Sequence, residues 1–331
     1  MNLKSIYALH GVFLATCCGF AMGQTAPSVV GSGYSPPVPI FIAPGGLTTI
    51  YVHGIGSEIS QPVLAAATPL PTKLAGISIS LLQTTAPSGP IPVPLLAVFP
   101  VSACRSPQFA PCGSVTGINL QIPFELVPNP STGPSGVVIP NYAQLVVTED
   151  GGAAATVEAM PLSDRIHILR AGDTLSSLGA AEADRPISTL NALVTHADGT
   201  PVAPLMGGTE AVPGETLVLY ATGIGPATPA AKSGEITLVP APIAWVTMAF
   251  DYNFHGEVSP HNPTLSTTTP TFSGLTPGFV GLYQVNFVVP DLPPNYRIVC
   301  GSQLGAGNLT VSIGRVTSFD GAKICVKVGG P

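Results

Sequence analysis

The feature that most constrains this chain is a stretch that occurs twice. "PGGLTTIYVHGIG" (44–56) and "PGETLVLYATGIG" (213–225) align without a gap, at a constant offset of 213 − 44 = 169 residues. Each copy opens with Pro-Gly, carries a Tyr and closes with Gly-Ile-Gly. The shared structural anchors are Pro44/Pro213, Gly45/Gly214, Tyr51/Tyr220, Gly54/Gly223 and Gly56/Gly225. An offset of this size predicts a duplicated domain.

A second pair of landmarks follows in the same order. Asn119-x-x-x-Pro123 ends one apolar run and Asn286-x-x-x-Pro290 ends another, at an offset of 286 − 119 = 167. A polar interval and a strand pair come after each of them. The preserved order predicts a repeating unit of about 140–160 residues, which is an ordinary domain size.

These landmarks divide the chain into four parts. We expect a signal segment at 1–23, a first domain at 24–169, a linker at 170–191 and a second domain at 192–331. The linker reads "RAGDTLSSLGAAEADRP" at its start, a small and polar composition typical of an exposed connection.

Composition and periodicity predict an all-β chain. Gly and Pro number 37 each in 331 residues, which disfavours long helices. In the second copy of the motif, Leu217 and Leu219 alternate with Val218 and Tyr220, the period of a strand with one face on a core. The prediction is two tandem antiparallel β-sandwiches. In this interpretation Pro-Gly starts an early strand, the Tyr anchors it in the core and Gly-Ile-Gly ends it. A phosphate cradle is disfavoured because no helix follows the glycines.

The N-terminus has the pattern of a secretory signal. Lys4 precedes an apolar run from about residue 6 to 20, and Ala21 and Gly23 stand at the −3 and −1 positions of a cleavage site after Gly23. Lipid attachment at Cys17 is the alternative. No later apolar run is long enough for a membrane helix, so the mature chain is expected to be exported without a membrane span. Its net charge, 10 − 17 = −7, disfavours nucleic acid as a partner.

Four cysteines remain after cleavage, and an even number in an oxidising compartment predicts disulfides. Three pairings are open. Pairing within each domain, Cys104 with Cys112 and Cys300 with Cys325, is the simplest. A zinc site is the rival interpretation, and the chain has none of the close Cys or His spacings that usually build one.

The sequence contains no catalytic motif of a known kind, and no cofactor is expected. The densest group of metal-ligating residues is His255, Glu257 and His261, with Asp251 nearby. A loop could bring them together on a metal, or they are simply the polar residues of a loop. Tyr283 beside Gln284 and Asn286 raises a sugar platform as a further hypothesis. The recurrence of the Asn at position 119, without an aromatic neighbour, favours a structural role at a strand end.

Other segments raise weaker alternatives. Glu149-Asp150-Gly151-Gly152 is either a calcium-binding carboxylate pair or a hairpin turn. His53 stands where the second repeat has an alanine, and is expected to face solvent.

A family resemblance rests on "VPGETLVLYATGIGP" (212–226) and "SGLTPGFVGLYQVNFVVPDLP" (273–293). These stretches resemble the Solibacter-type C-terminal domain, an uncharacterised family of exported acidobacterial proteins, and the first half resembles the region often found upstream of it. The resemblance implies a pair of Ig-like sandwiches outside the cell or in the periplasm, with no established activity. The four cysteines and the long segment 251–272 depart from the family pattern.

Two functions are compatible with the sequence. The first is a secreted, non-catalytic structural or adhesive module at the cell surface or in the extracellular matrix, which binds a surface polysaccharide or a protein through its loops. The second is an accessory domain or hydrolase with a loop-built, metal-dependent site around Asp251–His261. Binding needs only an exposed surface, whereas hydrolysis needs an oriented nucleophile or metal, so the first is favoured.

Overall fold

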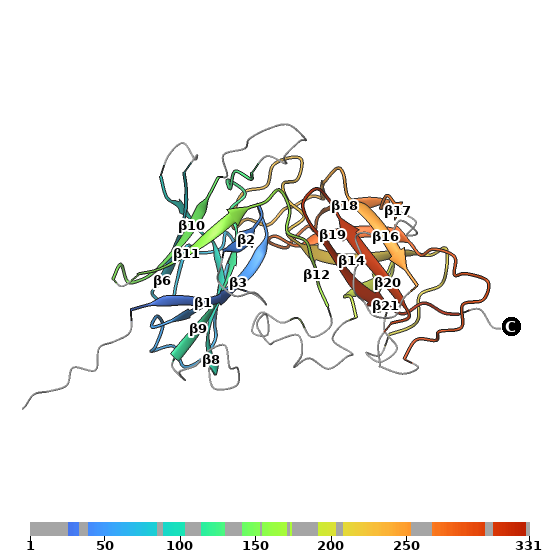
Figure 1. Ribbon diagram of the computed structural model, residues 1–331, viewed down its shortest axis with the longest axis horizontal. Helices are drawn as coiled ribbons and strands as arrows, with labels where there is room; N and C mark the ends of the chain where they lie inside the picture. Colours follow the sequence, from blue (N-terminus) through green and yellow to red (C-terminus); the bar gives the residue numbers. More distant parts are fainter. Residues whose placement is uncertain are drawn as a thin grey trace, which may run out of the picture.

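The computed structural model describes residues 26–32, 39–84, 89–102, 114–129, 141–152, 154–170, 173, 191–202, 208–252, 267–301 and 307–328. Over these residues the secondary structure consists of β-strands, and no helix among them is long and apolar enough to cross a membrane. Two groups of strands lie side by side, β1–β11 and β12–β21 (Figure 1). The prediction of two tandem Ig-like β-sandwiches is confirmed.

The first sandwich consists of two sheets. One has the order β1-β3-β9-β8-β4, and the other has the order β2-β11-β10-β6-β5 with β7 also paired to β6. All these pairs are antiparallel except β2 with β11. The strands are β1 (Ser28–Ser32), β2 (Ile40–Ile42), β3 (Leu47–His53), β4 (Val63–Leu64), β5 (Lys73–Leu74), β6 (Ile77–Gln83), β7 (Ile91–Pro92), β8 (Leu95–Ser102), β9 (Ser114–Gln121), β10 (Ala143–Glu149) and β11 (Ala154–Pro161).

The second sandwich has the same plan. One sheet has the order β12-β14-β19-β18-β15 with β13 also paired to β14, and the other has the order β17-β16-β20-β21. The strands are β12 (His167–Ile168), β13 (Val194–His196), β14 (Thr216–Thr222), β15 (Ala241–Pro242), β16 (Thr247–Asp251), β17 (Thr267–Thr268), β18 (Phe272–Leu275), β19 (Tyr283–Val288), β20 (Leu309–Gly314) and β21 (Phe319–Ile324).

The duplication holds at the level of strand register. Thr49 on β3 lies opposite Asn119 on β9, and Val218 on β14 lies opposite Asn286 on β19. These are the positions that the two sequence offsets relate to each other. The order β3-β9-β8-β4 in the first sandwich recurs as β14-β19-β18-β15 in the second. The repeated stretch was therefore copied together with the strand that pairs with it.

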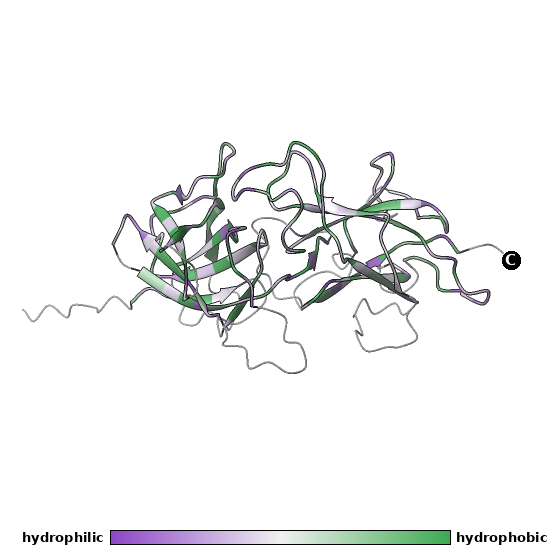
Figure 2. Ribbon diagram, turned by 90° about the horizontal axis from the view of Figure 1, so that it is seen from above, coloured by the Kyte–Doolittle hydropathy of each residue, from purple (hydrophilic) through white to green (hydrophobic). Residues whose placement is uncertain are grey.

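Each sandwich encloses its own core, and the strands carry its hydrophobic residues (Figure 2). The predicted alternation is present in β14, where Leu217 and Leu219 are fully buried while Val218 and Tyr220 are half-buried. Burial of such side chains contributes about 1.5–3 kcal/mol each.

The repeated tyrosines do not lie between the sheets, where a core anchor would be. Tyr51 packs with Phe99 in a small cluster apart from the main core, while its neighbours Ile50 and Val52 point into that core. Tyr220 is half-buried. The period of two explains the difference, because the Tyr sits one position out of phase with the core-facing residues. Burial raises the pKa of Tyr51 well above its usual value.

The second sandwich begins earlier than the predicted boundary at residue 169. β12 pairs with β14, and the Arg165 N–H donates to the carbonyl of Gly223 at 2.7 Å. The expected linker lies largely outside the described residues. Where it ends, Ala192 bridges to Arg170. By hydrogen bonding, residues from about Ser163 onward belong to the second sandwich.

Direct contacts join the two sandwiches. Gly234 donates its N–H to Gln121 Oε1 at 2.6 Å and accepts from the Leu70 N–H at 2.8 Å. Phe124 donates its N–H to Ser233 Oγ at 2.8 Å and packs against the core of the second sandwich. A side chain at position 45 would clash with the Phe124 ring, which explains the glycine in this copy of the motif.

The two Pro-Gly pairs are not equivalent, and this corrects the expectation that both copies supply the same structural anchors. Pro44 and Gly45 are buried, whereas Pro213 is half-buried and Gly214 is exposed. Pro213 and Gly214 form the turn before β14, and the Gly214 N–H donates to the carbonyl of Val289 at 2.9 Å. A side chain at position 214 would meet no atom within 4 Å. The second pair therefore shapes a turn at the surface. At the offset of 167 the residue equivalent to Phe124 is Asp291, which is exposed and provides no ring to cover the turn.

Candidate functional site

Several predicted site residues lie outside the described residues, namely His255, Glu257, His261, Cys104 and Cys112. Asp251, which begins the predicted loop, ends β16. Among the described residues, no group of three His, Cys, Asp or Glu side chains is placed to hold a metal ion. The hypothesis of a metal-dependent site at 251–261 therefore stays a prediction.

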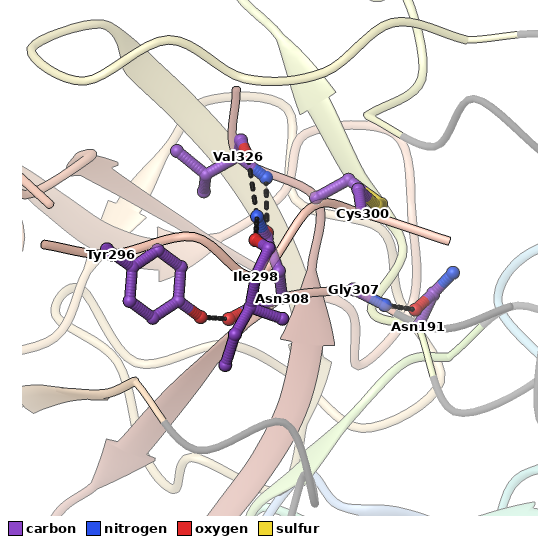
Figure 3. The surroundings of a disulfide bond; sticks show 8 residues. Asn191, Tyr296, Ile298, Cys300, Gly307, Asn308 and Val326 are labelled. Atoms are coloured by element: carbon purple, nitrogen blue, oxygen red, sulfur yellow. Dashed lines mark hydrogen bonds between the residues drawn. A yellow bond between two sulfur atoms is a disulfide. The ribbon is translucent and has the colours of Figure 1, made fainter. Parts of the chain in front are cut away.

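Cys300 and Cys325 form a disulfide with a Cα–Cα distance of 5.4 Å (Figure 3). Beside it, the buried Asn308 side chain donates to the carbonyls of Ile298 and Val326 and accepts from the Val326 N–H, each at 2.8 Å. Tyr296 donates its hydroxyl to the carbonyl of Asn308. These bonds hold the segment before Cys300 against the strand pair β20–β21, a structural role.

Tyr283 is fully buried, and its hydroxyl donates to the carbonyl of Gly225 at 2.7 Å. A ring in this position offers no face to a sugar. The side chain of Asn286 accepts from Gln284 Nε2 at 2.8 Å, and that of the buried Asn119 accepts from the Thr49 hydroxyl. Both asparagines form hydrogen bonds within their sheets, in positions that match a structural role.

The Glu149–Gly152 segment is the turn of the β10–β11 hairpin. Asp150 adopts a φ of 48° there and its carboxylate lies 2.9 Å from Lys73 Nζ. Glu149 accepts from the Gly56 N–H at 3.2 Å, so the two carboxylates have separate partners. His53, at the end of β3, is half-buried.

The most prominent exposed side chain is Trp245, the single tryptophan of the chain. It is 83% exposed and lies between β15 and β16 with a φ of 69°. Positive φ in a bulky residue is an outlier, and such strain costs about 1–3 kcal/mol. Retention of an exposed indole in a strained backbone is characteristic of a functional position rather than of packing.

Strand pairing places Trp245 where its segment passes from one sheet to the other. Ala241 pairs with Leu275 in one sheet, and Met248 pairs with Thr268 in the other. The register is the same on both sides, so the segment that contains Trp245 and the segment that contains Thr271 pass between the sheets together. The backbone bends at this corner, and the side chain projects from it.

Three more exposed apolar side chains lie near the other end of β15. Leu238 and Val239 precede the strand, and Phe279 lies in the turn before β19. The Gly278 N–H donates to the carbonyl of Thr237 at 2.8 Å, which holds the two loops together. We call Leu238, Val239, Trp245 and Phe279 the β15 edge. No charged residue occurs in 236–250 or 267–290, so this edge is electrically neutral.

A second constellation joins β13 to the loop before β14. His196 Nδ1 lies 3.1 Å from Glu215 Oε1, and its Nε2 lies 2.9 Å from the hydroxyl of the exposed Thr209. The hydroxyl and the imidazole are in hydrogen-bond contact, while the carboxylate lies close to the ring without forming a hydrogen bond, so the set resembles an activated nucleophile only in part. Hydrogen bonds from Thr200, aided by the charge of His196, lower the pKa of nearby Asp198.

Sequence reasoning missed both places. The signal available for Trp245 was its uniqueness, but the surrounding run "PIAWVTMAF" has the appearance of a buried strand. For the second constellation, Thr209 and Glu215 are separated from His196 by a loop, and their proximity depends on the β13–β14 pairing.

Comparison with known proteins adds little. No protein-family model and no curated protein matches the chain. The N-terminal Ig1-2 module of the Drosophila receptor protein tyrosine phosphatase DLAR matches 92% of this chain and 100% of its own, at 11% identity and a TM-score of 0.20. The match to a structure of tandem Ig repeats of Dlar covers 92% of this chain and 98% of that one, at 12% identity and a TM-score of 0.18. Because these TM-scores are low, the architecture rests on the strand pairings.

Proposed function

We propose that this chain is a secreted, non-catalytic binding module that acts as an adhesive or structural element at the cell surface or in the extracellular matrix. The β15 edge is its binding surface, and its ligand is a neutral polysaccharide. The observation that carries the proposal is Trp245, 83% exposed on a strained corner of the second sandwich.

The chemistry of the edge supports a sugar ligand. An exposed indole presents a large flat apolar face, and Trp is enriched where one side of a ring contacts a ligand and the other stays wet. The absence of charge from both flanking segments disfavours a polyanionic ligand, because such a ligand would need cationic partners. A protein that docks on the same apolar edge is the competing outcome.

Export is supported by two independent features. The N-terminal segment has a signal-peptide pattern, and the Cys300–Cys325 disulfide is of the kind that persists in oxidising compartments. N-terminal sequencing of protein recovered from the culture medium is expected to start at Gln24.

A pull-down tests the binding surface. Mature protein is mixed with insoluble neutral glucans, acidic exopolysaccharide and peptidoglycan, and the bound fraction is measured. The wild type is expected to bind a neutral polymer, and W245A to lose at least about tenfold in affinity, the equivalent of one aromatic contact of ~1.4 kcal/mol. F319A, at another exposed aromatic position of the same sandwich, is the matched control and is expected to bind normally. Equal binding by W245A would overturn the proposal.

The Thr209–His196–Glu215 constellation favours a second candidate function, ester hydrolysis. In that reaction the Thr209 oxygen attacks an ester carbonyl while His196 Nε2 takes its proton. The ester C–O bond breaks, the alcohol leaves with the proton from His196, and an acyl-Thr209 forms. Water, deprotonated by His196, then attacks the acyl carbon, and a carboxylic acid leaves while Thr209 regains its proton. Hydrolysis of a p-nitrophenyl ester, measured for wild type, T209V and H196A, tests it. Equal background rates in all three would eliminate this function.

A further inference from the structure

Lys323 is a buried lysine that belongs to neither candidate site. Its side chain is only 3% exposed, although lysine is among the residues least often buried without a partner. Among the described residues, no carboxylate lies within ion-pair distance of its amine. The side chain as a whole is shielded from water, and this desolvation lowers the pKa of Lys323. A lower pKa makes the neutral, nucleophilic amine easier to form than it is at an exposed lysine.

The neighbours of Lys323 lie in one row across the second sandwich. Thr310 on β20 pairs with Lys323 on β21, Asp251 on β16 pairs with Thr310, and Asn191 forms a parallel bridge to Lys323. The adjacent residues Phe250, Val311, Ala322 and Ala192 belong to the core. Because side chains alternate along a strand, the row lies on the opposite face of the sheet.

Asn191 is placed as an electrophile. It is 2% exposed and in register with Lys323, so their Cβ atoms are about one strand spacing apart, ~5 Å, within the reach of a lysine. Its Oδ1 accepts the N–H of Gly307 at 2.8 Å (Figure 3). That hydrogen bond draws electron density from the side-chain carbonyl and stabilises the oxyanion that forms when a nucleophile adds to Cγ.

We propose that Lys323 and Asn191 join in an intramolecular isopeptide bond. Lys323 Nζ adds to Asn191 Cγ and forms the Nζ–Cγ bond. A proton moves from Nζ to Nδ2, the Cγ–Nδ2 bond breaks, and ammonia leaves. No oxidant or other reactant is required. Thr310, in register with Lys323, places its hydroxyl as the nearest polar group of the row to assist this proton transfer.

The bond would fasten the segment before β13 to β21, the last strand of the second sandwich. With the Cys300–Cys325 disulfide, it would give the C-terminal part of the domain two covalent cross-links. This inference is independent of the proposed ligand, because it concerns the covalent structure and not the β15 edge.

Intact mass spectrometry of the mature protein tests the proposal. The isopeptide bond is expected to make the protein about 17 Da lighter than its disulfide-bonded sequence, since one ammonia is lost. Tryptic digestion is expected to yield one branched peptide that contains both residues. K323M and N191A are expected to show the full mass, and K327M, which changes an exposed lysine nearby, to retain the loss.

Two results would overturn the proposal. One is full mass in the wild type, with the peptides of Asn191 and Lys323 recovered separately. The other is a mass loss that persists in K323M, which would identify a succinimide at an asparagine instead. Circular dichroism of each variant separates a missing bond from a failure to fold.

Discussion

Asp164 fastens the segment between the sandwiches to the second one, and its removal is the sharpest test of that architecture. The residue is fully buried. Its carboxylate accepts the N–H groups of Val316 and Thr317 at 3.1 Å each, and both the N–H and the hydroxyl of Ser318, at 2.7 and 2.8 Å. One side chain thus orders the turn between β20 and β21.

In D164A the partly buried N–H groups of Val316 and Thr317 regain water, but the two buried donors of Ser318 do not. Hydrogen bonds to a charged acceptor contribute about 1.5–3 kcal/mol each, so the loss of the two Ser318 bonds is expected to lower the unfolding free energy by about 3–6 kcal/mol. D164N keeps one acceptor oxygen, and its unfolding free energy is expected to lie between those of the wild type and D164A. D198A, which removes an exposed aspartate, is the control and is expected to change stability by less than about 1 kcal/mol.

Urea titration measures the loss of unfolding free energy, and hydrogen exchange shows in which of the two sandwiches it occurs. Faster exchange is expected in β20 and β21 of D164A, with β10 and β11 unchanged. A loss below about 1 kcal/mol, or equal acceleration in both sandwiches, would refute the reasoning that Asp164 belongs to the second domain.

Three further predictions concern stability. Burial raises the pKa of Tyr296 to about 12, so between pH ~10 and ~12 the phenol is protonated in the folded state and ionised in the unfolded state. Its contribution to the unfolding free energy is therefore full below pH ~10 and falls as the pH rises toward ~12. Urea titrations over this pH range are expected to show a smaller fall for Y296F than for the wild type. G45A is expected to lower the unfolding free energy by about 1–3 kcal/mol, because position 45 has a φ of 72° and the Phe124 ring lies close to it. G214A is expected to lower it by about 1 kcal/mol, because position 214 has a φ of 86° but open space around it. Equal losses in the two variants would contradict this. C300A is expected to lose about 3 kcal/mol, because the Cys300–Cys325 bridge spans 25 residues, and an unchanged urea midpoint would contradict this.

The repeat makes most of the fold predictable from the sequence. The positions of Asn119 and Asn286 relative to the two copies of the motif indicate the pairing of β3 with β9 and of β14 with β19, because a copied strand keeps its partner. Alternation in β14 identifies its buried face, because a strand has a period of two. The different surroundings of Gly45 and Gly214 are not predictable in this way, because they depend on which segments pack over each turn.

The domain boundary was less predictable. β12 has two residues, too few for any periodic pattern, and its place depends on a pairing with distant Thr222. Asp164 also acts across more than 150 residues of sequence, so nothing local indicates its role.

The candidate sites were the least predictable part. Trp245 stands in an apolar run that would ordinarily be buried, and only the crossing of two strands between sheets turns it outward. Lys323 is a lysine, a residue usually exposed, and its burial and its bridge to Asn191 are seen only in the folded chain. Both depend on contacts that no local pattern encodes.

The most direct test of the proposed function uses Trp245 itself. Because it is the single tryptophan, the fluorescence of the mature protein reports on that side chain alone. In free protein, emission is expected to be that of a solvated indole and to be quenched readily by acrylamide. Titration with a neutral polysaccharide is expected to shift the emission to shorter wavelength and to protect it from acrylamide, with saturation. Binding seen by pull-down without any change in emission or quenching would contradict the assignment of the β15 edge.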